Sequence, residues 1–304
     1  MFYGFFKKVY YKIRDQINHD NLARLNNTKP LEGVEVKSYN YTNELGFNIY
    51  MPQDKETKAF IIDIHGGGWI SGDKDTNRNF CSYLAKEGFV VSSLDYRLID
   101  VSTHKDQVID VLNYVNYLVS HKEELNINLD KVVLTGDSAG AEFALLLYAI
   151  MKDEALAKLF DTTISSLNVL GLILNHSVTF LDQAGSLDGH KYLSKFVAIP
   201  GMLRILFADK KYETNPLYQK IKNPRAYLKH IPLVPIMLVT SLGDNNYYYQ
   251  TILLDKYLTE INAKHTLYVE EDLKASHVFN ITDPTSFLGV KCNKEIINFI
   301  SKLI

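Results

Sequence analysis

Short, nearly continuous apolar runs recur along the chain from residue 59 onward. They read AFIIDI (59–64), FVVSSL (89–94), KVVLTG (131–136), LGLIL (170–174) and PIMLVTSL (235–242). The strands of a parallel sheet are buried on both faces, so they lack the polar alternation of a half-exposed strand. Segments of helix length separate these runs. The pattern predicts an α/β architecture with a mostly parallel central sheet flanked by helices.

Apolar residues at helical spacing predict helices over 106–120, 139–153 and 246–261, and a last helix that ends in EIINFISKLI. Before the first buried run, residues 34–41 and 46–51 alternate apolar and polar positions around a polar turn. This alternation predicts an antiparallel pair of strands that opens the sheet.

Two segments depart from this rhythm. About sixty residues separate the strand that ends near Asn175 from the strand that begins near Pro235, several times the usual length of a connection. Their apolar and aromatic content predicts a partly helical lid rather than a linker. Residues 2–17 predict an amphipathic helix with a basic face, which we expect to pack on its own protein rather than to dock on a membrane surface.

Composition narrows the class of protein. The 304 residues, 46% of them hydrophobic and 22% charged, are typical of one globular domain over 1–304. The 33 basic and 35 acidic side chains give a net charge of -2, so no overall field favours nucleic acid. The longest apolar run, 143–151, is too short to span a bilayer. Lysines interrupt the apolar N-terminus, which we interpret as retained rather than as a signal peptide.

The cysteines point to a compartment. Cys81 and Cys292 form neither a disulfide framework nor a spacing typical of metal ligands. A reducing cytoplasm fits this usage best, and we expect no metal.

The segment VVLTGDSAGAEFALLL carries the strongest chemical signal. Gly136, Ser138 and Gly140 form G-x-S-x-G between a β-branched strand and an apolar helix, which is the context that this motif requires. Small residues two positions either side of the serine avoid a collision with the neighbouring strand and helix. The turn presents the Ser138 hydroxyl above the free N–H groups of a helix N-terminus, where developing negative charge is favoured.

A second signal is IIDIHGGGWISGD, in which three glycines after His65 follow a strand. They let main-chain N–H groups approach a substrate oxygen, as in an oxyanion hole, where one donor is worth about 100- to 1000-fold in rate. The alternative of a phosphate-binding loop lacks the G-K-[ST] that a P-loop needs. We expect His65 itself to brace the loop rather than to carry protons.

A serine nucleophile needs a histidine base that a buried carboxylate orients. Asp244 follows the strand PIMLVTSL and His277 follows the strand HTLYVEE, which matches the chain order of serine, acid and histidine in this kind of hydrolase fold. Glu271 and Asp272 are reserve acids. His265 is expected to begin a strand, and His176 to begin the lid.

These motifs together resemble the hormone-sensitive-lipase-like branch of the α/β-hydrolase fold. They are HGGGW (65–69), DYR (95–97), GDSAG (136–140), GD (243–244) and H-x-F (277–279). They occur in family order, and the match covers roughly residues 45–304.

The resemblance implies Ser138 as the nucleophile, His277 as the base and Asp244 as the acid that orients the base. The N–H groups that would form the oxyanion hole are those of Gly67, Gly68 and Ala139. A cap made of about residues 1–30 and the insertion at about 176–230 is implied over the acyl and alcohol pockets. Asp95, Arg97 and Asp110 are implied to form a buried structural pairing of arginine and carboxylate behind the site.

The sequence departs from the family pattern near the site. DYRLID lacks the usual Ala-Pro after Leu98, Asn246 replaces a usual apolar residue, and Ala141 and Glu142 stand where Gly and Asn are common. Glu142 could face the site and prefer a polar or sugar-bearing alcohol, or it could lie in its helix away from the chemistry.

The sequence therefore predicts a carboxylesterase, a serine hydrolase acting on small to medium acyl esters through an acyl-enzyme and using no cofactor. The alternatives are a deacetylase of acetylated sugars, an amidase or formamidase with the same machinery, and a hydrolase-fold protein that binds a ligand without turnover. Edge strands of this fold often pair, so a homodimer is a further expectation.

Overall fold

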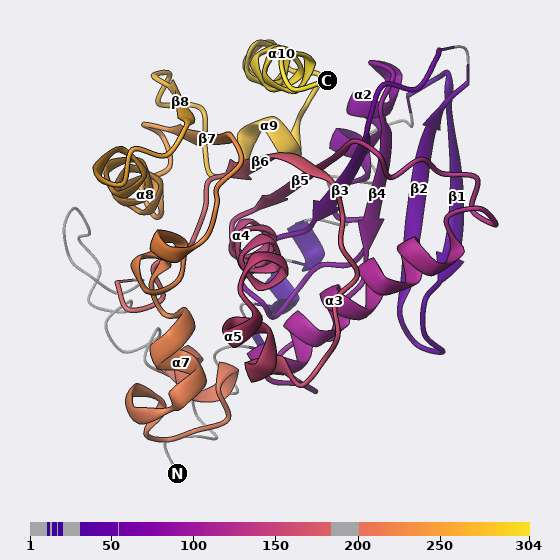
Figure 1. The fold of residues 1–304 in the computed structure, drawn as a ribbon. Helices are drawn as coiled ribbons and strands as arrows, with labels where there is room; N and C mark the ends of the chain where they lie inside the picture. Colours follow the sequence, from indigo (N-terminus) through magenta and orange to yellow (C-terminus); the bar gives the residue numbers. More distant parts are fainter. Residues whose placement is uncertain (1–10, 13, 17, 21–30, 54, 184–200) are drawn as a thin grey trace.

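The computed structural model describes residues 11–12, 14–16, 18–20, 31–53, 55–183 and 201–304 (Figure 1). Eight strands form one sheet in the order β1-β2-β4-β3-β5-β6-β7-β8. Their bounds are β1 Val34–Asn40, β2 Gly46–Pro52, β3 Phe60–Ile64, β4 Val90–Leu94, β5 Val132–Asp137, β6 Val169–Asn175, β7 Ile236–Ser241 and β8 His265–Glu270. The pairs β1–β2 and β2–β4 are antiparallel and the others are parallel, as the apolar runs predicted.

Helices cover both faces of the sheet (Figure 1). The longer ones are α2 Arg78–Lys86, α3 His104–His121, α4 Ala139–Lys152, α8 Tyr248–Glu260 and α10 Phe287–Ser301. Shorter turns of helix are α5 Glu154–Ala157, α7 Pro216–Ile221, α9 Phe279–Thr282, η1 Lys158–Phe160, η2 Tyr212–Thr214, η3 Pro224–Ala226 and η4 Leu228–His230. In the described part of the chain, no helix is both long and apolar enough to cross a bilayer.

Alternation along the buried strands builds two separate cores. In β3, Phe60 and Ile62 belong to the core that also contains residues of α3, α4 and α8, whereas Ile61 belongs to the core that contains residues of α2, α9 and α10. Both faces of the strand are therefore apolar, which explains its nearly continuous apolar sequence. Asp63, on the face of Ile61, is the buried exception in this run.

The predicted elements are confirmed with shifts of one or two residues at their ends. The helix predicted over 106–120 begins at His104, because Thr103 and Asp106 form a capping box ahead of the apolar stripe. α2 was not predicted. The carboxyl ends of β5, β6, β7 and β8 meet at one edge of the sheet, the edge that carries Ser138, His176 and Asp244.

The two segments implied as a cap are described in part. The described residues within 11–20 are helical, and Arg14 pairs with Asp100 at 2.9 Å, so part of the basic face contacts this protein itself. Residues 1–10 lie outside the described residues. In the insertion, residues 201–206 and α7 are helical, whereas 184–200 lie outside the described residues.

Candidate active site

Ser138 lies on a sharp turn between β5 and α4. Its backbone has φ 52° and ψ -114°, a strained conformation for a residue other than glycine. The neighbouring glycines make this turn possible. A Cβ on Gly136 would lie 2.3 Å from the carbonyl oxygen of Gly140, and a Cβ on Gly140 would lie 1.9 Å from that of Ile64. The steric reason predicted for G-x-S-x-G is thus confirmed.

The glycine loop after β3 turns its main chain beside this serine. Gly67 and Gly68 have φ 108° and 61°, which side chains rarely tolerate. The carboxylate of Asp137 accepts a hydrogen bond from Gly66 N at 3.0 Å and so ties the loop to the residue before Ser138. Within the described residues, the N–H groups of Gly67 and Gly68 have no protein acceptor. That of Ala139, the first residue of α4, has no helical carbonyl to bind.

His65 supports this loop. Its side chain is buried, its Nδ1 lies 2.7 Å from Gly66 O, and its ring stacks on Tyr96 at 4.3 Å between centroids. The Tyr96 hydroxyl donates to His65 O at 2.9 Å. Burial lowers the pKa of His65, which keeps the ring neutral. This geometry fits a bracing role.

Asp244 and His277 meet at the carboxyl ends of β7 and β8. His277 Nδ1 lies 2.7 Å from Asp244 Oδ2, while Oδ1 accepts from the N–H groups of Asn246 and Tyr247. Burial alone would raise the pKa of Asp244, but hydrogen bonds from two histidines outweigh it and hold the pKa well below its usual range. An ionised carboxylate only accepts, so Nδ1 of His277 carries the proton. Its Nε2 is then the free acceptor that a base requires.

His176 is the second histidine on Asp244. Its Nδ1 lies 2.8 Å from the same Oδ2 atom, and its side chain has no exposed surface. The sequence places His176 at the start of the lid but does not predict its contact with Asp244. Its position directly after a strand that neighbours β5 was the only signal that could have placed it in the site.

The chain around His176 also joins Ser138 to this cluster. Ser138 N donates to Asn175 O at 2.9 Å, and Val178 N donates to Ser138 O at 3.2 Å. Residues 175–178 therefore hold the nucleophile turn on one side and Asp244 on the other.

The same three side chains, His176, Asp244 and His277, could in principle be metal ligands, since their donor atoms lie within 4.8 Å of one another. The two distances of 2.7 and 2.8 Å between nitrogen and oxygen are those of charge-assisted hydrogen bonds. We interpret the cluster as hydrogen-bonded.

The reserve candidates lie elsewhere. Glu271 and Asp272 are exposed and follow β8. His265 begins β8, as predicted, and its Nε2 lies 3.2 Å from Asp255 at the amino end of the strand, far from the carboxyl edge.

Glu142 follows Ser138 by one helical turn and is 1% exposed. Its carboxylate contacts Nε2 of His104 at 3.1 Å and Nε1 of Trp69 at 3.4 Å. The His104 ring stacks on Phe207 of the insertion at 5.5 Å. Glu142 therefore joins the glycine loop, α3 and the insertion from inside the protein.

The pairing implied behind the site needs a correction. Arg97 and Asp110 form two hydrogen bonds of 2.8 Å, but the Arg97 side chain is 37% exposed rather than buried. Asp95 does not join them: it accepts from Gly46 N at 3.0 Å and from Lys74 N at 2.7 Å. Asp110 binds the backbone and side chain of Arg97, whereas Asp95 binds the backbone at Gly46 and Lys74.

Comparisons with known proteins bear on the family and the fold of this chain. Over 107 residues the chain is 31% identical to the acetyl esterase of Salmonella schwarzengrund (strain CVM19633). The matched residues make up 35% of this chain and 33% of that protein. The match therefore spans about a third of the length of these curated relatives.

Solved structures cover far more of the chain. Esterase B from Lactobacillus Rhamnosis (HN001) is 25% identical with a TM-score of 0.90, covering 99% of this chain and 96% of that one. A form of esterase B inhibited by a tributyrin phosphonate is 25% identical with a TM-score of 0.87, covering 98% and 95%. The BD-FAE family model matches residues 47–254. Since that model covers more than half of the chain and the fold agrees with it, the chain belongs to the BD-FAE family of α/β hydrolases.

Proposed function

We propose that this protein is a carboxylesterase, a serine hydrolase that cleaves carboxylic esters through an acyl-enzyme. One observation carries the proposal: Asp244 holds the Nδ1–H of His277 at the sheet edge where the strained turn presents Ser138. Nucleophile, base and orienting acid thus come from the ends of three different strands.

The reaction follows from these positions. Ser138 Oγ attacks the ester carbonyl carbon as His277 Nε2 takes the hydroxyl proton, and the negative oxygen is held by N–H groups of Gly67, Gly68 and Ala139. The bond from the carbonyl carbon to the alkoxy oxygen breaks, and His277 gives its proton to the departing alcohol. Water, deprotonated by His277, then attacks the acyl-enzyme, releases the acid and restores Ser138. Asp244 stabilises the imidazolium in both halves, and no step uses a metal or cofactor.

Small to medium acyl chains are the proposed substrates. One solved form of esterase B is inhibited by a C4-C4 tributyrin phosphonate, and the matched relative is an acetyl esterase. Deacetylation of sugars by the same residues is the second candidate, favoured by the match to an acetyl esterase, and cleavage of amides or formamides would use the same acyl-transfer steps. A matched panel of acetyl-sugar, aryl-ester and amide substrates separates these classes.

The test compares wild type and Ser138→Ala on nitrophenyl esters from acetate to laurate. We expect turnover to fall by about three to six orders of magnitude in Ser138→Ala while the melting temperature is retained. The chain length at which kcat/KM peaks measures the acyl pocket. Substantial activity in the variant contradicts the assignment, and no turnover by folded wild type favours the ligand-binding alternative.

We further propose that residues 1–30 and 176–230 form a cap over the pockets. The contact of Arg14 with Asp100 and the stacking of Phe207 on His104 support this arrangement. Phe207→Ala should move the chain-length optimum toward longer acyl groups, and an unchanged optimum contradicts a role in lining the pocket.

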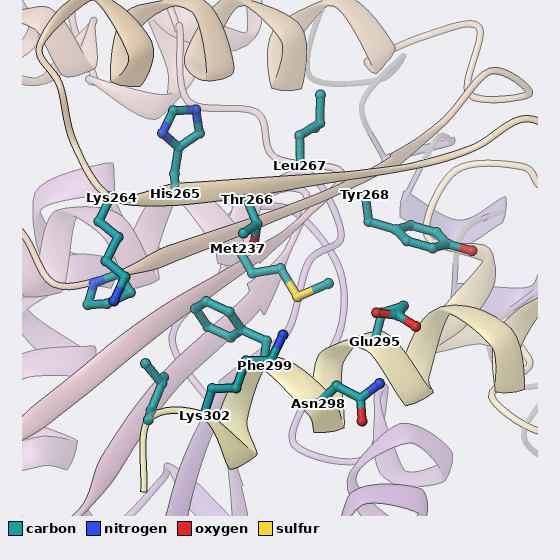
Figure 2. Close-up of a pocket in the computed structure, with 12 residues that line it drawn as sticks. Met237, Lys264, His265, Thr266, Leu267, Tyr268, Glu295, Asn298, Phe299 and Lys302 are labelled. Carbon is teal, nitrogen blue, oxygen red and sulfur yellow. The ribbon is translucent and has the colours of Figure 1, made fainter.

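A homodimer through β8 is proposed as well. Within the described residues β8 pairs only with β7, which leaves one strand edge open. A pocket of about 300 Å³ lies beside it between β8 and α10, where Met237, Tyr268 and Phe299 line an apolar hollow (Figure 2). Sedimentation equilibrium over a concentration series tests the dimer, and a monomer at every concentration contradicts it.

The proposed compartment is the cytoplasm, because Cys81 and Cys292 are both buried free thiols. Cell fractionation tests this, and recovery from an oxidising compartment contradicts it.

A further inference from the structure

Two imidazoles share one carboxylate oxygen at the candidate active site. His176 Nδ1 and His277 Nδ1 lie 2.8 and 2.7 Å from Asp244 Oδ2, and the two rings meet edge to face with centroids 5.3 Å apart. The acyl-transfer chemistry uses only one of them. His277 retains 26% of its side-chain exposure, whereas His176 has none, so only His277 can meet a substrate.

The buried histidine is held as a neutral donor. Burial lowers the pKa of His176 and outweighs the opposing hydrogen bond to Asp244, so the ring stays uncharged. Because the carboxylate only accepts, the single ring proton of His176 is on Nδ1. Its Nε2 is buried and has no partner among the described residues, so the Asp244 contact is the side-chain hydrogen bond that fixes the ring.

The backbone also keeps His176 in place. Its φ is 48°, in the left-handed region, where histidine and asparagine are among the better tolerated residues. His176 N donates to Val239 O at 2.7 Å, which anchors this conformation to β7. The position is therefore built to aim a donor at Asp244.

We propose that His176 is a positioning residue, whose Nδ1–H fixes Asp244 and limits how strongly that carboxylate stabilises the protonated form of His277. This inference rests on the proposed function. A second donor on Oδ2 spreads the negative charge that His277 would otherwise receive alone. Without that donor, imidazolium is favoured to higher pH, and a smaller fraction of the enzyme carries the free base in mildly acidic solution.

Other charged or titratable groups face the pair and remain constant in the test. Asp137 of β5 acts electrostatically on His176, and the Tyr247 ring lies 4.9 Å from His277. Phe279 of α9 packs against His176 at 5.7 Å and contributes no charge.

The experiment measures how the rate of Ser138 labelling by a fluorophosphonate depends on pH, together with kcat/KM on nitrophenyl butyrate. In labelling, Ser138 Oγ attacks phosphorus, fluoride leaves, and the hydroxyl proton passes to His277. His176→Phe removes the donor and keeps the ring. His176→Asn keeps an N–H at the same branch of the side chain and suits the left-handed backbone. His265→Asn, a histidine paired with Asp255 away from the site, is the matched control.

We expect the acidic limb of both profiles to move to higher pH by about one unit in His176→Phe, because a carboxylate that loses one of its two imidazole donors stabilises the remaining imidazolium more strongly. On the acidic side this means about tenfold lower kcat/KM. The limb should stay near the wild-type position in His176→Asn and His265→Asn. A limb that does not move in His176→Phe, or that moves equally in His176→Asn, overturns the proposal.

Proton NMR decides the case in which His176→Phe fails to fold. Wild type should show a far-downfield N–H proton from each imidazole bonded to Asp244, and His176→Asn should lose the proton of His176 and keep that of His277. A spectrum that loses no such proton in His176→Asn overturns the proposal. Failure of the proposed function is distinct, because it would abolish labelling and turnover in wild type itself.

Discussion

Asp63→Asn should change how the stability of this protein depends on pH. Asp63 has no exposed surface, and its Oδ2 accepts from Asn77 Nδ2 at 3.0 Å. The same amide donates to Asp137 at 2.7 Å, so a carboxylate lies close by. Burial, followed by the charge of Asp137, raises the pKa of Asp63 to about 8. The folded protein therefore holds a proton at neutral pH that the unfolded chain releases.

The sign and size follow from proton linkage. Stability due to this carboxyl is fully present below its ordinary pKa of 3.8 and is lost as pH rises through about 8. The difference between a pKa of 3.8 and one of about 8, at about 1.4 kcal/mol per pH unit, sets an upper bound of about 6 kcal/mol. Water penetration and relaxation reduce this, so we expect a loss of about 2–4 kcal/mol.

Urea unfolding at several pH values from 5 to 9 measures the effect. Asparagine has the shape of the protonated acid and does not ionise, so the stability of Asp63→Asn relative to wild type should grow by about 2–4 kcal/mol as pH rises across this range. The exposed Asp130→Asn is the matched control, and its difference from wild type should be constant. A flat difference for Asp63→Asn would refute the reasoning, because it would mean that Asp63 is ionised in the folded protein.

Two further substitutions test packing at the site. Gly140→Ala places a Cβ 1.9 Å from Ile64 O, so it should abolish esterase turnover and lower the unfolding free energy by more than about 2 kcal/mol. The control Gly33→Ala, where a Cβ has no atom within 4 Å, should cost about 1 kcal/mol because of its positive φ. Near-normal turnover in Gly140→Ala contradicts the geometry of the turn. Glu142→Leu leaves the buried His104 without its carboxylate partner and should lower the unfolding free energy in urea by about 3 kcal/mol. Glu142→Gln keeps an acceptor and should cost about 1 kcal/mol. Equal losses would show that the pairing is not what stabilises this position.

The fold could be predicted from the sequence because its strands and its main turn each impose a local residue pattern. Strands buried on both faces must be apolar throughout, so runs such as KVVLTG could be identified without knowledge of their neighbours. The turn at Ser138 could be predicted in the same way, since only glycine fits at positions 136 and 140. Asp244 and His277 were placed by their order after particular strands, and the structure brings them together.

What the sequence did not reveal depends on contacts between distant segments. His176 and Asp244 are 68 positions apart, and nothing in the residues around His176 distinguishes it from the start of a lid. The bond of Asn77 to Asp63 and Asp137 is of the same kind, because three segments must meet before its role exists. Periodicity reports which face of an element is buried, but not which polar side chains meet inside.

The place of β5 within the sheet has a consequence for how the protein responds to heat. β5 lies between β3 and β6, with four strands of the sheet on one side of it and three on the other, and both apolar cores cover it. Amide hydrogens of such a strand exchange with solvent only through the largest openings, whereas those of the edge strands β1 and β8 exchange through smaller ones. We therefore expect Ser138 to follow one of the slowest-exchanging strands of the protein. Its geometry should survive until the whole domain unfolds, so thermal inactivation and global melting should occur together.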